Sequence, residues 1–213
     1  VSLPSFDNNI FSNTLTAADY QKITLFNRAI GGTYPSGSTI KPFIASAALA
    51  ENTVSPDYKV DDTLGYISIQ NQYDPEIIYT YRDWKAHGFV DMRRALAVSA
   101  NVYFYVIGGG YKNIKGLGIN LIDKYLNLFG FGSKLGIDIP GEADGLVPSP
   151  VWKKIAKNES WFTGDTYNVS IGQGDVLVTP LQMVAAVSSI ANDGALLKPQ
   201  LVSKITDESG RSV

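Results

Sequence analysis

Residues 34–42 read Tyr34-Pro35-Ser36-Gly37-Ser38-Thr39-Ile40-Lys41-Pro42. They place a serine hydroxyl and a lysine amine three positions apart, just before an apolar run over residues 43–50. Proline is tolerated best in the first turn of a helix, so Pro42 predicts a helix that begins near Ser38 and runs to about Glu51. Residues three positions apart share a helix face, so Ser38 and Lys41 are expected together at its N-terminal end. The apolar run predicts that this helix is buried.

This spacing suits nucleophilic chemistry. A serine is a weak nucleophile until a base takes its proton, and a lysine can act as that base only when it is neutral. Burial favours the neutral amine, so a buried Ser38–Lys41 pair would make a nucleophile and its base. On these two residues alone, the simpler interpretation is an N-cap serine beside an exposed lysine.

The composition narrows the classes of function. The chain has 213 residues, of which 45% are hydrophobic and 18% charged, as expected for one globular domain or a large part of one. Its net charge of −2 argues against nucleic acid as the main ligand. No apolar run approaches the roughly 20 residues that span a bilayer, so no membrane contact is expected from this chain. The absence of cysteine excludes disulfides and thiolate metal sites.

Hydrophobic periodicity and capping signals predict helices and strands in mixed order. Helices are expected over residues 91–97 and after Asn101, and an amphipathic helix over 117–129. Thr179-Pro180-Leu181-Gln182 is a strong helix start, and Gly194 ends that helix. Alternating residues predict strands near Tyr66–Ile69 and over Gln200–Ile205. We therefore expect a mixed α/β or α+β protein.

Several short stretches stand out along the chain. Residues 38–41 have the pattern Ser-x-x-Lys and residues 99–101 the pattern Ser-x-Asn. The stretches that carry the resemblance are Ser38-Thr39-Ile40-Lys41, Ser99-Ala100-Asn101, Tyr81-Arg82-Asp83-Trp84, Ile139-Pro140-Gly141-Glu142, Trp161-Phe162-Thr163-Gly164-Asp165 and Ser170-Ile171-Gly172-Gln173-Gly174. The chain thus resembles class B, elongation-specific D,D-transpeptidases of the penicillin-binding protein 2 type. The resemblance implies an α/β (α+β) fold of the serine β-lactamase and penicillin-binding transpeptidase type, with a helical subdomain and part of an antiparallel sheet.

The resemblance also implies a function for the motif residues. The chain would cross-link peptidoglycan stem peptides through an acyl-enzyme on Ser38, and β-lactams would acylate the same serine. Lys41 would be the base for acylation, Ser99 would relay a proton, and Asn101 would bind the substrate peptide and help to hold Lys41. The Ser38 N–H would supply half of an oxyanion hole. No cofactor and no metal are expected.

Partners and location are likewise implied by the resemblance. The expected partners are peptidoglycan stem peptides, β-lactams, and proteins of the elongation complex, including a glycosyltransferase. The expected location is the periplasmic, extracytoplasmic face of the bacterial inner membrane, with an anchor outside this chain.

One element of the family pattern is missing, because no Lys-Thr-Gly occurs in the 213 residues. We therefore expect residues 1–213 to be a partial transpeptidase domain that lacks the Lys-Thr-Gly strand. Its sheet should be truncated at both ends, and the chain alone should be inactive. Two alternatives remain open: a serine β-lactamase or D,D-carboxypeptidase on the same scaffold, and a non-catalytic β-lactam sensor or scaffold.

Two other groups of residues have simpler explanations. Asp83 and the only histidine, His87, are four positions apart near Asp61-Asp62, which could suggest a metal site. With no cysteine and no second histidine, a loop ion pair is the better prediction. The run Gly108-Gly109-Gly110 lacks the lysine of a phosphate-binding loop and is predicted to end a helix.

Overall fold

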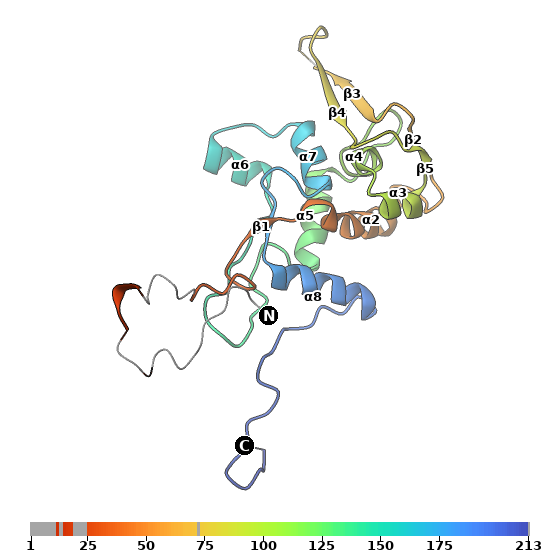
Figure 1. The fold of residues 1–213 in the computed structure, drawn as a ribbon. Coiled ribbons are helices and arrows are strands. Elements are labelled where there is room, and N and C mark those ends of the chain that lie inside the picture. The colour runs from red at the N-terminus through yellow and green to blue at the C-terminus, as the bar shows by residue number, and fades with distance from the viewer. Residues whose placement is uncertain (1–11, 13–14, 19–24, 72, 213) are drawn as a thin grey trace. The chain divides into compact units, whose positions relative to one another are not determined.

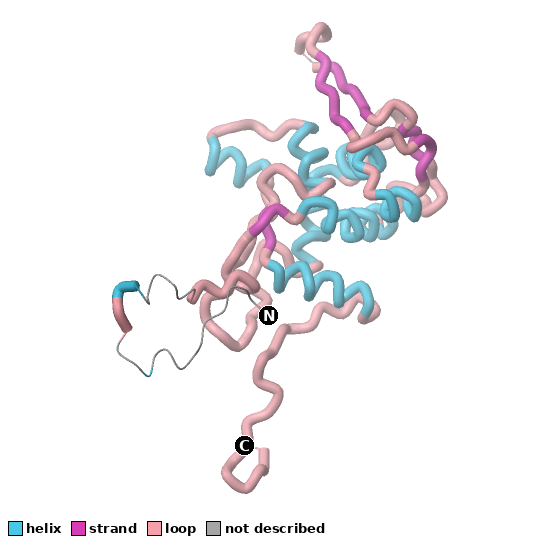
Figure 2. Tube along the Cα trace, viewed as in Figure 1, coloured by secondary structure: helices cyan, strands magenta, loops and turns pink. Residues whose placement is uncertain are grey.

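The computed structural model describes residues 12, 15–18, 25–71 and 73–212. Figure 2 shows that helices and loops make up most of the described chain and that the strands are short. In chain order the elements are β1 (Tyr34–Pro35), the 3₁₀ helix η2 (Gly37–Ile40), α2 (Lys41–Ala50), β2 (Val60–Asp62), β3 (Tyr66–Gln70), β4 (Ile78–Arg82), β5 (Gly88–Val90), α3 (Met92–Val98), α4 (Asn101–Gly109), α5 (Gly118–Leu128), α6 (Pro150–Lys157), α7 (Thr163–Ser170), β6 (Leu177–Val178) and α8 (Pro180–Ala191).

The chain divides into two compact units. One comprises residues 35–128 and 147–176, and the other draws on residues 1–34, 129–146 and 177–213. None of the helices among the described residues has the length and apolar character needed to cross a bilayer. The predicted mixture of helices and short antiparallel strands is confirmed.

Helix α4 forms the core of the larger unit. Its residues from Val102 to Gly108 are all buried, and it packs against α2, α5 and α7 (Figure 1). A Cβ atom at Gly108 would collide with the Ser170 side chain of α7, and one at Gly109 with the Tyr167 ring. Two of the three glycines predicted to end this helix, Gly108 and Gly109, therefore lie inside it. Their lack of a side chain lets α7 approach closely. Gly110 ends the helix with a φ of 85°.

Two antiparallel strand pairs lie in the same unit. The strand predicted near Tyr66 is β3, which pairs with β4 from Tyr66 opposite Arg82 to Gln70 opposite Ile78. These two strands form the hairpin labelled in Figure 1. β2 pairs with β5, which sets Asp62 opposite Gly88. The second pair brings Asp62 next to the loop that carries His87.

The smaller unit contains α8 and the loops that hold its start. Thr179 and Gln182 form the predicted capping box, in which each side chain accepts a hydrogen bond from the backbone N–H of the other residue. Gln182 is buried, and its amide also donates to the carbonyls of Ser133 and Asp144. This glutamine therefore joins the helix start to the loop over residues 133–144.

The strand predicted over Gln200–Ile205 is wrong for the described structure. These residues form no strand and no ladder within the described chain, and Leu201, Val202 and Ile205 are exposed. The backbone N–H groups of Leu201 and Val202 donate to the Asp138 carboxylate, each at 2.9 Å. Alternation alone indicates a strand only when a second strand supplies backbone partners, and here a side chain takes that place.

Candidate active site

Ser38 and Lys41 lie where the sequence predicted, at the start of a buried helix. The first turn is the 3₁₀ helix η2, and α2 follows from Lys41 with Pro42 in its first turn. The Lys41 N–H donates to the Ser38 carbonyl. Side chains at i and i+3 eclipse in a 3₁₀ turn, so this geometry keeps Ser38 and Lys41 on one face more closely than an α-turn would.

Two glycines bring a second loop against this turn. Gly37 has a φ of 54°, and its N–H donates to the Gly172 carbonyl at 2.8 Å. A Cβ atom at Gly172 would collide with the Gly37 carbonyl and the Ser36 hydroxyl. The loop after α7 therefore supports the backbone directly ahead of Ser38.

The Lys41 amine lies inside the larger unit and has three oxygen partners. The side chain is 1% exposed. Its Nζ donates to the Asn101 Oδ1 at 2.7 Å, to the Ser99 carbonyl at 2.8 Å and to the Ser99 hydroxyl at 3.1 Å. These acceptors match the three donors of an ammonium group, and none of them carries a formal charge.

This environment changes the acidity of Lys41. Burial lowers the pKa of Lys41 to about 8, although the negative charge of Asp83 acts in the opposite direction. The neutral amine is therefore roughly 300-fold more populated near pH 7 than for an ordinary lysine. Such an amine can accept a proton at physiological pH.

Ser99 and Asn101 reach Lys41 because the chain turns sharply between α3 and α4. Ser99 ends α3 in the left-handed conformation, with φ 56° and ψ 40°, which is uncommon for a residue other than glycine. Asn101 is the first residue of α4. The turn thus points both the carbonyl and the hydroxyl of Ser99 at the amine to which Asn101 also binds. Strained backbone of this kind is frequent at functional sites.

The Ser38 hydroxyl stands apart from this hydrogen-bonded group. Ser38 is exposed, and its hydroxyl has no hydrogen-bond partner within the described residues. The side chains of Lys41, Ser99 and Asn101 are therefore joined directly, while the Ser38 hydroxyl lies one turn from Lys41 without a hydrogen bond to its amine. Its backbone N–H lies in the first turn of η2, where such groups have no partner inside the helix.

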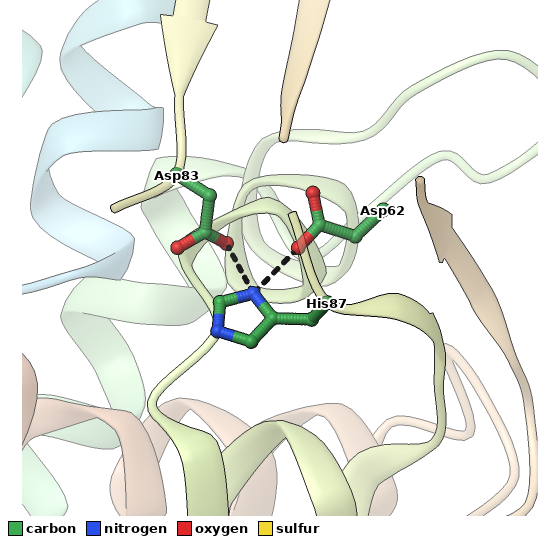
Figure 3. A group of neighbouring side chains, drawn as sticks. All are labelled: Asp62, Asp83 and His87. Carbon is green, nitrogen blue, oxygen red and sulfur yellow. Dashed lines mark hydrogen bonds and ion pairs between the residues drawn. The ribbon is translucent and has the colours of Figure 1, made fainter. Parts of the chain in front are cut away.

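His87 lies next to two aspartates of the larger unit. Figure 3 shows the carboxylates of Asp62 and Asp83 on the same side of its ring, where dashed lines join both to Nδ1. Its Nδ1 is 2.8 Å from the Asp62 Oδ2 and 3.7 Å from the Asp83 Oδ2. The predicted contact between His87 and a nearby aspartate is therefore present, but it is buried and the nearer partner is Asp62. Burial raises the pKa of Asp62, and the hydrogen bond from His87 opposes this. The three side chains offer ligand atoms within 4.8 Å of one another, so they are the described residues that could hold a cation.

Asp83 links this cluster to the hydrogen-bonded group of Lys41, Ser99 and Asn101, here called the Lys41 group. The sequence did not predict this role. Its Oδ2 accepts a hydrogen bond from the Val102 N–H at 2.8 Å, in the first turn of α4. The residue that precedes α4, Ala100, has no side-chain cap, so Asp83 supplies one from a distant part of the chain. Asp83 therefore helps to fix the start of the helix on which Asn101 lies. The stretch Tyr81-Arg82-Asp83-Trp84 marked this aspartate in the sequence, but nothing local indicated its partner.

Known proteins resemble the chain over its whole length. The family described as "Penicillin binding protein transpeptidase domain" matches residues 1–213 of this chain. The peptidoglycan D,D-transpeptidase MrdA of Acinetobacter baumannii is 37% identical over 210 residues, which cover 95% of this chain and 30% of that protein. The chain thus spans about a third of the length of such relatives.

Solved structures of penicillin-binding proteins are also similar to this chain. The structure of Pseudomonas aeruginosa PBP2 in complex with WCK 5153 superposes with a TM-score of 0.85 at 32% identity, over 100% of this chain and 49% of that one. Helicobacter pylori PBP2, solved in complex with MreC, has a TM-score of 0.81 at 31% identity, over 94% of this chain and 36% of that one.

Proposed function

The chain belongs to the penicillin-binding protein transpeptidase domain family, and we propose that the protein cross-links peptidoglycan stem peptides as a serine D,D-transpeptidase. The observation that carries this proposal is the buried Lys41 amine, which is held by uncharged acceptors one turn from an exposed serine hydroxyl. Residues 1–213 would form part of the transpeptidase domain, without the Lys-Thr-Gly strand of the family pattern.

The proposed reaction has two steps. The Ser38 Oγ attacks the penultimate D-Ala carbonyl of a donor stem, and neutral Lys41 takes its proton. The C–O bond to Ser38 forms, the C–N bond to the terminal D-Ala breaks, and the proton passes through Ser99 to the leaving amine. An amine of an acceptor stem then attacks the acyl-enzyme, its proton returns by the same residues, and Ser38 is released. Asn101 holds Lys41 and binds the donor peptide.

A β-lactam would stop at the first step, because its opened ring keeps the leaving nitrogen attached. The decisive experiment is labelling of the full-length protein with fluorescent penicillin. Stable labelling is expected, and Ser38→Ala should abolish it. Ser46→Ala is the matched control, because this serine lies farther along α2 and donates to the Pro42 carbonyl. An unlabelled wild-type protein would overturn the proposal.

The same assay separates the two alternatives. Rapid release of the label would indicate a β-lactamase, and hydrolysis of the terminal D-Ala without cross-linking would indicate a carboxypeptidase. Stable labelling without cross-linking of a lipid-linked substrate would indicate a β-lactam sensor or scaffold.

The relatives support a proposal for the partners and the location of this protein. The H. pylori relative was solved with MreC, so this protein is proposed to work with MreC-like and other elongation proteins, including a glycosyltransferase. Its proposed location is the periplasmic face of the inner membrane. Pull-down of such proteins by the full-length protein, and its extraction with the membrane fraction, would test this assignment.

A further inference from the structure

An open groove lies beside the β3–β4 hairpin, and its described lining does not include Lys41, Ser99 or Asn101. It has a volume of about 560 Å³, and its lining combines aromatic rings with side-chain amides. The rings include those of Tyr79, Tyr81, Trp161 and Phe162, and Asn168 contributes an amide. Tyr79 and Phe162 are 44% and 60% exposed, so their faces are open to a ligand.

Packing fixes the part of the groove that Tyr81 lines. The Tyr81 ring packs edge-on against Tyr167 at 4.7 Å and against Tyr105 at 5.9 Å between ring centroids. Any side chain at Gly164 would collide with the Tyr81 hydroxyl, so this glycine keeps α7 close to the hairpin. The Tyr81 ring is therefore held in place by its neighbours, which favours a preformed site.

The charges in the groove select the kind of ligand. None of the described residues that line it is basic. Its one carboxylate, Asp165, accepts two hydrogen bonds from Lys153 at 2.8 Å and caps the Phe162 N–H. The Lys153 ammonium borders the groove, 5.7 Å from the centre of the Phe162 ring, but it is already paired with Asp165 and Glu159. The described lining therefore offers no unpaired cation to a phosphate or a free carboxylate. Aromatic faces beside amides instead suit a neutral ligand with flat apolar faces and a polar edge, as a sugar ring has.

The position of the groove relative to Ser38 sets an upper limit on the length of a connecting peptide. Thr163 and Gly164 line the groove at the start of α7, and Asn168 lines it nearer the end of that helix. Just past the helix end, the Gly172 carbonyl accepts a hydrogen bond from the Gly37 N–H. The eight residues of α7 span about 12 Å. An extended peptide of about four residues covers a similar distance. In a donor stem the reacting D-Ala carbonyl is separated from the sugar by about this many residues.

We infer that this groove binds the glycan strand that carries the donor stem peptide. The inference rests on the proposed function, because it names the sugar part of the same substrate. The aromatic rings would stack on sugar faces, and the stem would run along α7 to Ser38. A free stem peptide is the poorer occupant, since its carboxylates would meet no unpaired cation among the described lining residues.

The test measures KM and kcat of the full-length protein for substrates with and without sugar. The variants are Phe162→Ala and Tyr79→Ala, singly and together. Phe89→Ala is the matched control, because Phe89 is 62% exposed but lies outside the groove lining. The double variant should raise KM for glycan-linked pentapeptide about tenfold, with kcat within about twofold. KM for the sugar-free pentapeptide and the rate of penicillin acylation should not change.

A direct binding measurement completes the test. Peptide-free glycan strands should quench or shift the tryptophan fluorescence of the wild-type protein and of Phe89→Ala, and binding should be lost in the double variant. An equal rise in KM for the sugar-free pentapeptide would assign the groove to peptide and overturn the inference, as would unchanged binding of glycan strands. Loss of penicillin labelling in the wild type would refute the proposed function separately, since glycan binding is measured without turnover.

Discussion

Two lysines of the larger unit, Lys41 and Lys153, both expose little surface to solvent but have opposite electrostatic surroundings. Lys41 is 1% exposed and Lys153 is 7% exposed. Uncharged oxygens of Ser99 and Asn101 surround Lys41, and burial lowers its pKa to about 8. Burial also acts to lower the pKa of Lys153, but the hydrogen bonds and charges of Asp165 and Glu159 outweigh it, so that pKa is raised.

The difference shows that burial alone does not make a lysine a base. A buried ammonium beside carboxylates stays charged and serves as half of an ion pair. A buried ammonium beside neutral acceptors keeps its hydrogen bonds but gains little charge compensation, so it loses its proton more easily. The residues that contact each lysine, together with its depth, distinguish a candidate catalytic group from a structural one.

The largest expected effect is the loss of the Lys41 amine. Lys41→Met should slow acylation of the full-length protein by fluorescent penicillin by about 10²–10⁴-fold, because Ser38 would lose its base. The rate is measured by stopped-flow mixing, and circular dichroism checks that the variant is folded. Acylation at a near-normal rate would remove Lys41 from the proposed role.

A smaller effect is expected when the Lys41 site is made to resemble the Lys153 site. Asn101→Asp places a carboxylate 2.7 Å from the Lys41 amine, at the position of the present amide oxygen. The added charge should raise the pKa of Lys41 and slow acylation at pH 7 by about ten- to a hundredfold. The midpoint of the pH–rate profile should move upward, which a mere loss of fold would not cause. A lower rate at every pH with an unchanged midpoint would contradict this explanation.

The wild-type protein should show the lowered pKa of Lys41 directly. Only the neutral amine accepts a proton, so the acylation rate should rise with pH and level off above about pH 8. Below that value the rate should change about tenfold per pH unit. The measurement is the second-order acylation rate from pH 6 to 9.5. A profile that is flat over this range would show that Lys41 does not limit acylation through its protonation.

The smallest effect on acylation is expected at the other lysine. Lys153→Met should change the penicillin acylation rate by less than about twofold, because Lys153 has no contact with the Lys41 group. It should nevertheless lower the free energy of unfolding by about 1–3 kcal/mol, since Asp165 loses its charged donor. Urea unfolding monitored by fluorescence measures this loss. A large decrease in acylation with unchanged stability would reverse the distinction between the two lysines.

Local patterns in the sequence predicted many of the helices. The Pro42 signal predicted the helix start at Ser38, and Thr179 with Gln182 predicted the start of α8, because caps and first-turn prolines act within four residues. The amphipathic period predicted α5 within a residue at each end. The alternation of Gln200–Ile205 misled, because pairing depends on a partner strand that a local pattern does not describe.

The sequence by itself determined that Ser38 and Lys41 share one face of a helix start, since three positions make one helical turn. Only the tertiary structure decided what Lys41 contacts. Its partners Ser99 and Asn101 are 58 and 60 positions away, and Asp83 reaches the start of α4 across 19 positions. Both the burial that lowers the pKa of Lys41 and the absence of a carboxylate among its hydrogen-bond partners within the described chain arise from packing between distant segments. Spacing can place a lysine beside a serine, but its proton affinity depends on the groups that the fold brings around it.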